Sequence, residues 1–106
     1  MAGTNPKEKV VEAYLRTMVE ERGGKCLKLD PANLVGFPDR LVIMPQAIFI
    51  VEVKRPRGGR LSEHQKHWRK RIREMGHAHV LIWCNADVEE FMDLYDKEFG
   101  DYVASR

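Results

Sequence analysis

The fold is decided by one stretch of the chain, which reads Gly36-Phe37-Pro38-Asp39-Arg40-Leu41-Val42-Ile43-Met44-Pro45-Gln46-Ala47-Ile48-Phe49-Ile50-Val51-Glu52-Val53-Lys54. It contains two apolar runs, residues 39–44 and 47–54, and Pro45-Gln46 between them favours a tight turn. The pattern predicts an antiparallel hairpin whose second strand is covered on both faces, because that strand is apolar almost throughout. Ionised groups are rarely buried without a partner, so the charged side chains at the strand ends indicate a site.

Helical patterns flank this hairpin on both sides. Asn5-Pro6-Lys7-Glu8 suits a capped helix start, and apolar residues then recur at helical spacing as far as Gly23-Gly24, which predicts a helix over about residues 6–22. Beyond the hairpin, Ser62-Glu63-His64-Gln65 is a capping-box pattern that opens a second helix, which Gly76 ends.

Two further strands and a last helix complete the pattern. Residues 26–29 precede the hairpin, residues 78–84 follow the second helix, and Asn85-Ala86-Asp87 caps a third helix whose tail we expect to fray from Gly100. The order α-β-β-β-α-β-α predicts an α/β fold with a mixed four-stranded sheet and a C-terminal helix. The crossover through the second helix makes the last strand parallel to the second hairpin strand. The length fits a single domain over residues 1–106.

The bulk composition favours a cytoplasmic protein without a membrane partner. No apolar run approaches the roughly 18 residues of a membrane-spanning helix, and the first residues lack the apolar segment of a secretion signal. Cys26 and Cys84 show no metal-binding spacing and fit reduced thiols.

The formal net charge of +2 conceals a strong asymmetry along the chain. From residue 54 to residue 73 the basic side chains face a single acid, Glu63, and they are Lys54, Arg55, Arg57, Arg60, Lys66, Arg69, Lys70, Arg71 and Arg73. From Asp87 onward acidic residues dominate. The basic sector indicates a polyanionic partner, and the alternative is a solvated helix face.

Three charged residues of the hairpin are expected to meet at one end of the sheet. Glu52 and Lys54 share a strand face about 7 Å apart, and Asp39 opens the antiparallel neighbour beside them. Two carboxylates at a sheet end suit a hard cation such as Mg²⁺, and a lysine suits a phosphate or an attacking water. The alternative is an exposed strand end with a salt bridge between Asp39 and Lys54.

Gln65 is a polar residue on the inner stripe of the second helix, in line with Trp68 and Ile72. In the first turn, its amide is expected to point toward the sheet end that carries Glu52. The alternative is a capping bond to the Ser62 backbone, and the two roles could compete for one side chain.

Three segments together resemble a known family of nucleases. They are Gly36-Phe37-Pro38-Asp39-Arg40, Val51-Glu52-Val53-Lys54-Arg55-Pro56 and Leu61-Ser62-Glu63-His64-Gln65. The first two resemble the PD-(D/E)XK signature, and the set is similar to its VRR-NUC branch, the virus-type replication-repair nucleases. The resemblance implies a restriction-endonuclease-like α-β-β-β-α-β core that cleaves phosphodiester bonds with Mg²⁺ or Mn²⁺.

The resemblance also implies roles for individual residues. Asp39 and Glu52 would be metal ligands together with the main-chain carbonyl of Val53, and Lys54 would orient or activate the water. Related nucleases supply a further glutamate from the first helix, where Glu8 and Glu12 lie one turn apart. Glu8 suits the capping box, so Glu12 is the predicted ligand, and plain solvent exposure is its alternative.

The resemblance to stand-alone junction resolvases implies a homodimer that cleaves four-way junctions or other branched DNA during replication, repair or recombination, in a phage or bacterial host. The residues expected to contact the DNA backbone are Arg55, Arg57, Arg60, Lys66, Arg69, Lys70 and Arg73. Two alternatives stay open, a non-catalytic DNA-binding module and a nicking or exonucleolytic end-processing enzyme with the same site.

Overall fold

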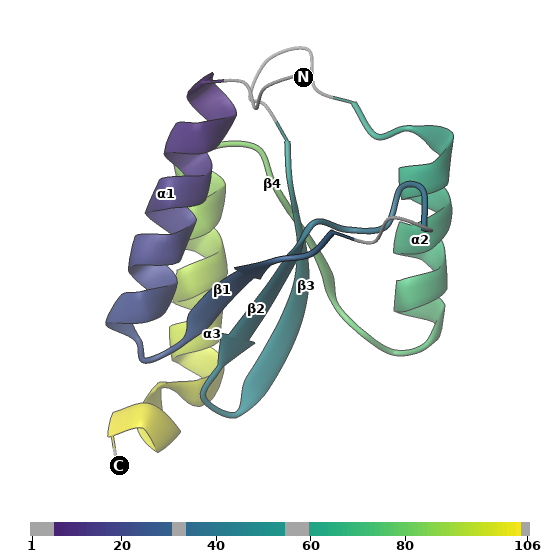
Figure 1. The fold of residues 1–106 in the computed structure, drawn as a ribbon. Helices are drawn as coiled ribbons and strands as arrows, with labels where there is room; N and C mark the ends of the chain where they lie inside the picture. Colours follow the sequence, from purple (N-terminus) through teal and green to yellow (C-terminus); the bar gives the residue numbers. More distant parts are fainter. Residues whose placement is uncertain (1–5, 31–33, 55–59, 105–106) are drawn as a thin grey trace.

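The computed structural model describes residues 6–30, 34–54 and 60–104 of the chain. Within these ranges the order of elements is α-β-β-β-α-β-α, as predicted (Figure 1). The elements are α1 (Pro6–Glu21), β1 (Lys25–Lys28), β2 (Arg40–Met44), β3 (Ala47–Val53), α2 (Glu63–Glu74), β4 (His79–Ile82) and α3 (Asn85–Ala104).

The strands form one mixed sheet in the order β1-β2-β3-β4. The first three strands are an antiparallel meander, and β4 pairs with β3 in parallel after the crossover through α2. The turn between β2 and β3 places Gln46 at a positive φ of 71°, which lets two residues reverse the chain. The predicted topology is therefore confirmed.

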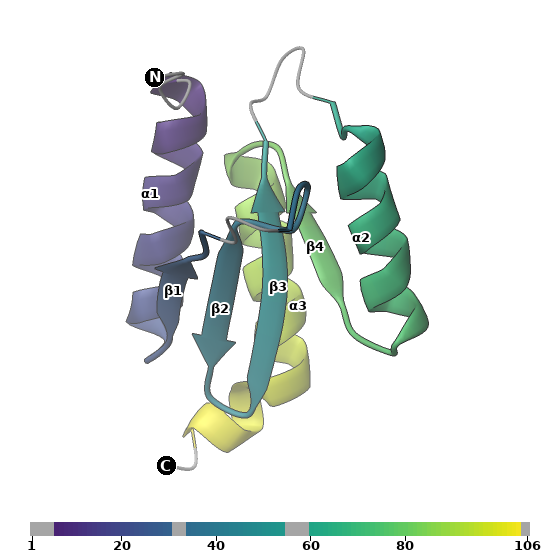
Figure 2. The ribbon, with the colours of Figure 1, turned by 45° about the vertical axis from the view of Figure 1, so that its right-hand side comes forward.

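The helices divide unequally between the faces of the sheet. Figures 1 and 2 show α1 and α3 together on one side, whereas α2 lies on the other side beside β4. The main core fills the space under α1 and α3, and its fully buried members include Leu15, Val19, Val42, Val51 and Met92. Alternate residues of β3 point into this core, so Glu52, between Val51 and Val53, points toward the side of α2.

Polar contacts fix α1 against α3. Two nitrogens of the Arg22 guanidinium donate to Asp96, Nε to Oδ1 and Nη2 to Oδ2, at 2.8 Å each. In the middle of α1, the Tyr14 hydroxyl donates to Glu89 of α3 at 2.8 Å. These contacts hold the helix whose first turns face the predicted site.

The end of α3 differs from the prediction. The helix does not fray from Gly100 but continues to Ala104. Phe99 packs against the core, and its ring centroid lies 5.2 Å from that of Tyr95, whose hydroxyl donates to the carbonyl of Pro45 at 2.8 Å. Tertiary packing of this aromatic pair therefore outweighs the low helix propensity of the glycine.

The start of α3 also differs in detail. Asn85 is already helical, and the carbonyl of Cys84 accepts from the backbone amides of Asp87 and Val88 at 3.0 and 3.3 Å. The Asp87 carboxylate reaches back to accept from the Trp83 amide at 2.8 Å, so it secures the helix entry from inside the first turn. No helix in the described ranges is long and apolar enough to cross a membrane.

Candidate functional site

Asp39 and Glu52 lie opposite each other where the β2–β3 hairpin ends. Arg40 is paired with Val51, so the next step of the same antiparallel register sets Asp39 against Glu52. The structure thus brings together the two carboxylates that the sequence pattern placed at one sheet end.

Burial gives these carboxylates unusual acid–base properties. Glu52 is only 5% exposed, and burial, followed by the charge of Asp39, raises its pKa to about 8, while Lys54 pulls it down less strongly. Burial also raises the pKa of Asp39 to about 6, against a smaller lowering by the backbone of Val53. Because the two carboxylates are close, ionisation of one disfavours ionisation of the other. A cation bound between them would remove this repulsion.

The two carboxylate oxygens of Asp39 differ in their contacts. Its Oδ2 lies 3.1 Å from Nη1 of Arg40, whereas its buried Oδ1 has no hydrogen-bond partner among the described residues. Buried polar atoms are nearly always satisfied, so this oxygen indicates a partner outside the described residues, and a bound cation is one such partner. Carboxylate oxygens are the ligands that Mg²⁺ and Mn²⁺ prefer, and this pair fits such an ion.

The described residues do not gather a complete set of side-chain ligands. No group of three acidic, histidine or cysteine side chains lies close enough within these ranges to hold a metal ion. A cation at the Asp39–Glu52 pair would therefore take other ligands from backbone, water or phosphate, as Mg²⁺ commonly does.

The two glutamates of α1 differ in their surroundings. Glu12, the predicted ligand, forms an ion pair with the buried guanidinium of Arg40. Glu8 is half-buried, and its negative charge raises the pKa of both Asp39 and Glu52. The structure therefore places Glu8 within electrostatic reach of the carboxylate pair and commits Glu12 to Arg40.

Lys54 and Gln65 are in direct contact. Lys54 Nζ donates to Gln65 Oε1 at 3.3 Å, and the same oxygen accepts from the Ser62 amide at 2.8 Å. The Ser62 hydroxyl in turn accepts from the Gln65 amide at 3.1 Å, which completes the capping box. Gln65 therefore both points toward the sheet end and caps the helix, so its two predicted placements coexist. Among the described residues, the alternative salt bridge between Lys54 and Asp39 is not formed, because Asp39 pairs with Arg40 and Lys54 with Gln65.

The segment before Asp39 locks α2 onto the hairpin. Gly36 has a φ of +83°, and a Cβ there would lie 2.4 Å from Cβ of His64. The next residue, Phe37, meets Trp68 edge to face with ring centroids 5.0 Å apart. Only glycine permits this approach, which brings the first turn of α2, and with it Gln65, next to Lys54.

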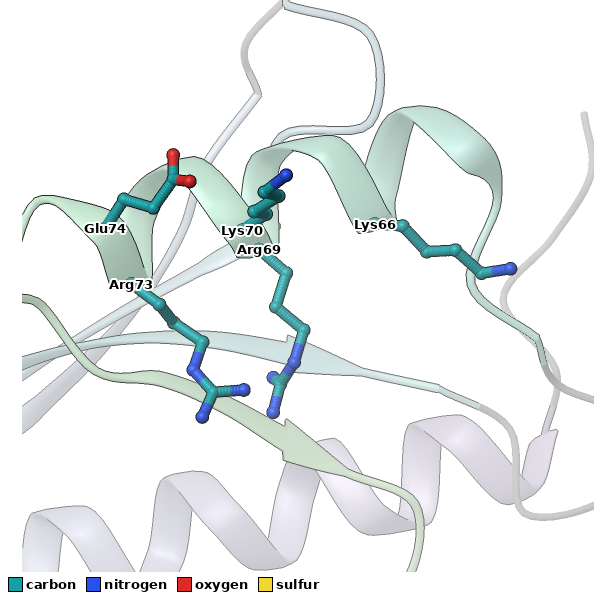
Figure 3. A pocket seen from close by; sticks show the side chains of 5 residues that line it. All are labelled: Lys66, Arg69, Lys70, Arg73 and Glu74. Atoms are coloured by element: carbon teal, nitrogen blue, oxygen red, sulfur yellow. The ribbon is translucent and has the colours of Figure 1, made fainter.

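Basic side chains follow one side of α2. Figure 3 shows Arg69 and Arg73 extending from the helix toward the strands. A surface hollow of about 500 Å³ is lined here by Lys66, Arg69, Lys70, Arg73 and Glu74. Arg60 is exposed, whereas Arg55 and Arg57 lie outside the described residues.

Arg69 also contacts the sheet directly. Its Nη1 donates to the carbonyl and contacts Nδ1 of His79, each at 2.8 Å. Burial, followed by the charge of Arg69, lowers the pKa of His79. A neutral imidazole that accepts at Nδ1 fits both observations, so Arg69 ties α2 to β4 in addition to lining the hollow.

Sequence reasoning missed the roles of Arg40, Glu8 and Phe37. A signal for Arg40 was present, because strand alternation puts it in phase with the buried Val42 and Met44. No local signal joins Phe37 to a tryptophan in a distant helix.

Comparison with known proteins finds a solved domain with a similar fold. No protein-family model matches the chain, and no curated protein matches it. Among solved structures, one described as a VRR_NUC domain superimposes with a TM-score of 0.79 at 30% sequence identity, over 86% of this chain and 99% of that one. The similarity therefore spans nearly all of the solved domain.

Proposed function

The chain belongs to the VRR-NUC family of PD-(D/E)XK-type nuclease domains, and from that premise we propose that it is a metal-dependent DNA endonuclease. The observation that carries the proposal is the carboxylate pair of half-buried Asp39 opposite buried Glu52, with pKa values of about 6 and about 8. One buried oxygen of Asp39 has no hydrogen-bond partner among the described residues. A site built in this way is poised for a cation and for the phosphate that accompanies it.

The carboxylates of Asp39 and Glu52, with the main-chain carbonyl of Val53, would hold Mg²⁺ or Mn²⁺. Such an ion, when bound, supplies Lewis-acid activation of the phosphate and lowers the pKa of a water. Lys54 is held by Gln65 close to Glu52, so its ammonium group would orient the attacking water and offset charge on the phosphate oxygens.

From α1 we assign Glu8 as the acid that adds negative charge to this site. Its charge raises the pKa of both carboxylates, whereas the charge of Glu12 is matched by Arg40. Glu8 would act on the cation directly or through a water, which suits the loose coordination sphere of Mg²⁺. This assignment replaces the predicted ligand Glu12 by the residue one turn earlier.

The basic side of α2 would hold the DNA backbone. Lys66 directly follows Gln65, so the cations of the hollow begin next to the site and continue down the helix. The set proposed to contact phosphates comprises Arg55, Arg57, Arg60, Lys66, Arg69, Lys70 and Arg73. Such contacts position DNA without reading its sequence, which favours recognition of DNA shape.

A second copy of the chain would complete the enzyme. The pairing of β1, β2 and β3 puts five aliphatic side chains on the sheet face away from α1 and α3, namely Leu27, Leu41, Ile43, Ile48 and Ile50. Ile48 is 64% exposed and Leu27 45%. A contiguous exposed apolar patch of this kind is unusual on a monomer and marks an interaction surface. We propose that this face joins two protomers into a homodimer that holds branched DNA, with four-way junctions favoured, in replication, repair or recombination in the cytoplasm of a bacterial or phage-infected cell.

Two measurements, a cleavage assay and sedimentation, separate this function from its alternatives. Labelled linear, flap and four-way-junction DNA are incubated with the protein in Mg²⁺, Mn²⁺ or EDTA, and sedimentation is run on the wild type and on Ile48→Asp. The proposal predicts metal-dependent cutting of branched DNA by a dimer that Ile48→Asp dissociates. Binding without cutting in any metal would indicate a DNA-binding module, and trimming of linear ends would indicate an end-processing nuclease.

A further inference from the structure

Arg40 is a buried cation at the edge of the carboxylate site. It is 5% exposed, although a buried guanidinium is costly unless every contact is well made. An arginine at the first residue of a strand could readily extend into solvent, but Arg40 points inward, where its guanidinium contacts Glu12 and Asp39.

The guanidinium joins two elements. Nη2 pairs with Glu12 Oε1 on α1, whereas Nη1 contacts both Oδ2 and the main-chain carbonyl of Asp39, at 3.1 and 3.0 Å. A planar fork held at both ends restricts rotation of the carboxylate that it touches. With Oδ2 held in this way, Oδ1 is the oxygen of Asp39 left without a partner among the described residues.

The ion pair also leaves the local charge balanced. Arg40 contributes one positive charge and Glu12 one negative charge, so the two together add no net charge beside a bound cation. An isolated arginine at this place would repel that cation, and an isolated glutamate would compete with Asp39 for it. The pair therefore provides rigidity without changing the charge of the site.

We infer that Arg40 is a positioning residue, which fixes the carboxylate of Asp39 for a divalent cation and is itself anchored by Glu12. This inference rests on the proposed function, because it assumes that Asp39 binds the metal. It gives Glu12 the role of an anchor for Arg40 in place of a metal ligand.

The inference is tested by calorimetry of Mn²⁺ binding to the wild type, Arg40→Met, Glu12→Gln and the double variant of these two changes. Glu52→Gln, which removes a proposed ligand, is measured as the reference. Loss of an outer-shell partner costs about 10–100-fold in metal affinity, and we expect a loss of that size for Arg40→Met. Glu12→Gln leaves the contact of Arg40 with Asp39 in place and should lose only a few-fold. The double variant keeps the wild-type net charge, so a loss equal to that of Arg40→Met would report geometry and not charge.

Two further variants guard against a trivial loss of folding. Arg40→Lys keeps the charge but cannot span Glu12 and Asp39, so it should lose Mn²⁺ affinity while its thermal unfolding in EDTA stays cooperative. Arg22→Met removes the ion pair with Asp96 between α1 and α3, and it should lower the unfolding temperature without changing Mn²⁺ affinity.

Each contrary result has a definite meaning. Wild-type affinity in Arg40→Met or in Arg40→Lys would overturn the positioning role. A loss in Glu12→Gln as large as that in Glu52→Gln would make Glu12 a ligand and overturn its role as anchor. A wild-type protein that binds no Mn²⁺ would overturn the proposed function itself, and the inference with it.

Discussion

The ammonium group of Lys54 donates to Oε1 of Gln65 at 3.3 Å, which joins the end of the hairpin to the first turn of α2. Because Ser62 donates to the same oxygen at 2.8 Å, one amide both caps a helix and holds the lysine that we assign to catalysis. Oε1 of Gln65 thus serves both helix capping and lysine orientation, whereas the Ser62 hydroxyl, which accepts from the Gln65 amide, serves capping alone. Mutation of one residue or the other can therefore separate the two effects.

Gln65→Ala should impair both stability and cleavage, whereas Ser62→Ala should impair stability alone. Either change breaks the capping box, at a cost of about 1 kcal/mol in the free energy of unfolding. Only Gln65→Ala also releases Lys54, and a displaced catalytic group lowers the cleavage rate by about tenfold or more. Chemical denaturation and single-turnover cleavage measure the two effects. Equal cleavage rates in the two variants would show that the contact with Lys54 has no catalytic role.

Gly36→Ala should be far more damaging than Gly76→Ala. Both glycines have a positive φ, +83° and +88°, so alanine pays a similar backbone penalty of about 1–2 kcal/mol at each. A Cβ at Gly36 would also meet His64 and the backbone of α2 at 2.4–2.7 Å, whereas nothing lies within 4 Å at Gly76. We expect Gly36→Ala to lose at least about 2 kcal/mol more in urea unfolding, by overpacking. Similar losses in both would mean that the loop yields freely.

Glu52→Gln should stabilise the metal-free protein at alkaline pH. The pKa values of about 6 for Asp39 and about 8 for Glu52 lie above their ordinary 3.8 and 4.5, so the folded state keeps protons that the unfolded chain releases. Stability of the wild type therefore falls as pH rises from 4.5 to 8. If Glu52→Gln recovers about 1 kcal/mol, the unfolding temperature at pH 8 in EDTA rises by about 4–8 °C.

The difference between Glu52→Gln and wild type should shrink as pH falls from 8 and vanish below about 4.5, because Glu52 is protonated in both states only below its ordinary pKa of 4.5. Glu98→Gln, the same change at an exposed position of α3, serves as the control and should track the wild type at every pH. A difference for Glu52→Gln that does not vary with pH would contradict the assigned pKa.

Removing the basic side chains of α2 should lower the affinity for DNA and make that affinity less sensitive to salt. Each lost phosphate contact flattens the plot of log affinity against log salt by about 0.9, so Lys66→Ala, Lys70→Ala and Arg73→Ala combined should flatten it by about 2–3. Fluorescence anisotropy in EDTA measures binding without cleavage. Lys97→Ala on the acidic helix α3 should leave the slope unchanged, and an unchanged slope in the triple variant would place the DNA elsewhere.

Much of the framework could be predicted because it depends on local pattern. Alternation and turn residues in the hairpin define its register, and that register alone sets Asp39 opposite Glu52. Helical spacing locates α1 and α2, and the capping box of Ser62 and Gln65 marks the start of α2. Asn5, the predicted cap of α1, lies outside the described residues. The end of α3 could not be predicted, because Phe99 is held by packing that no local propensity expresses.

The finer parts of the site depend on contacts between distant residues. Arg40 meets Glu12 of α1, and Phe37 meets Trp68 of α2. Which glutamate of α1 faces the carboxylate pair depends on the rotation of that helix, which a one-turn spacing leaves open.

The central claim is that the Asp39–Glu52 pair is a metal-dependent nuclease centre. Single-turnover cleavage of a four-way junction in Mn²⁺, with enzyme saturating over DNA, compares the wild type, Glu52→Gln and Glu98→Gln. We predict that Glu52→Gln binds the junction but is slower by about 10³-fold or more, the loss expected for a group that stabilises the transition state, and that Glu98→Gln cuts like the wild type. Normal cleavage by Glu52→Gln would contradict the account.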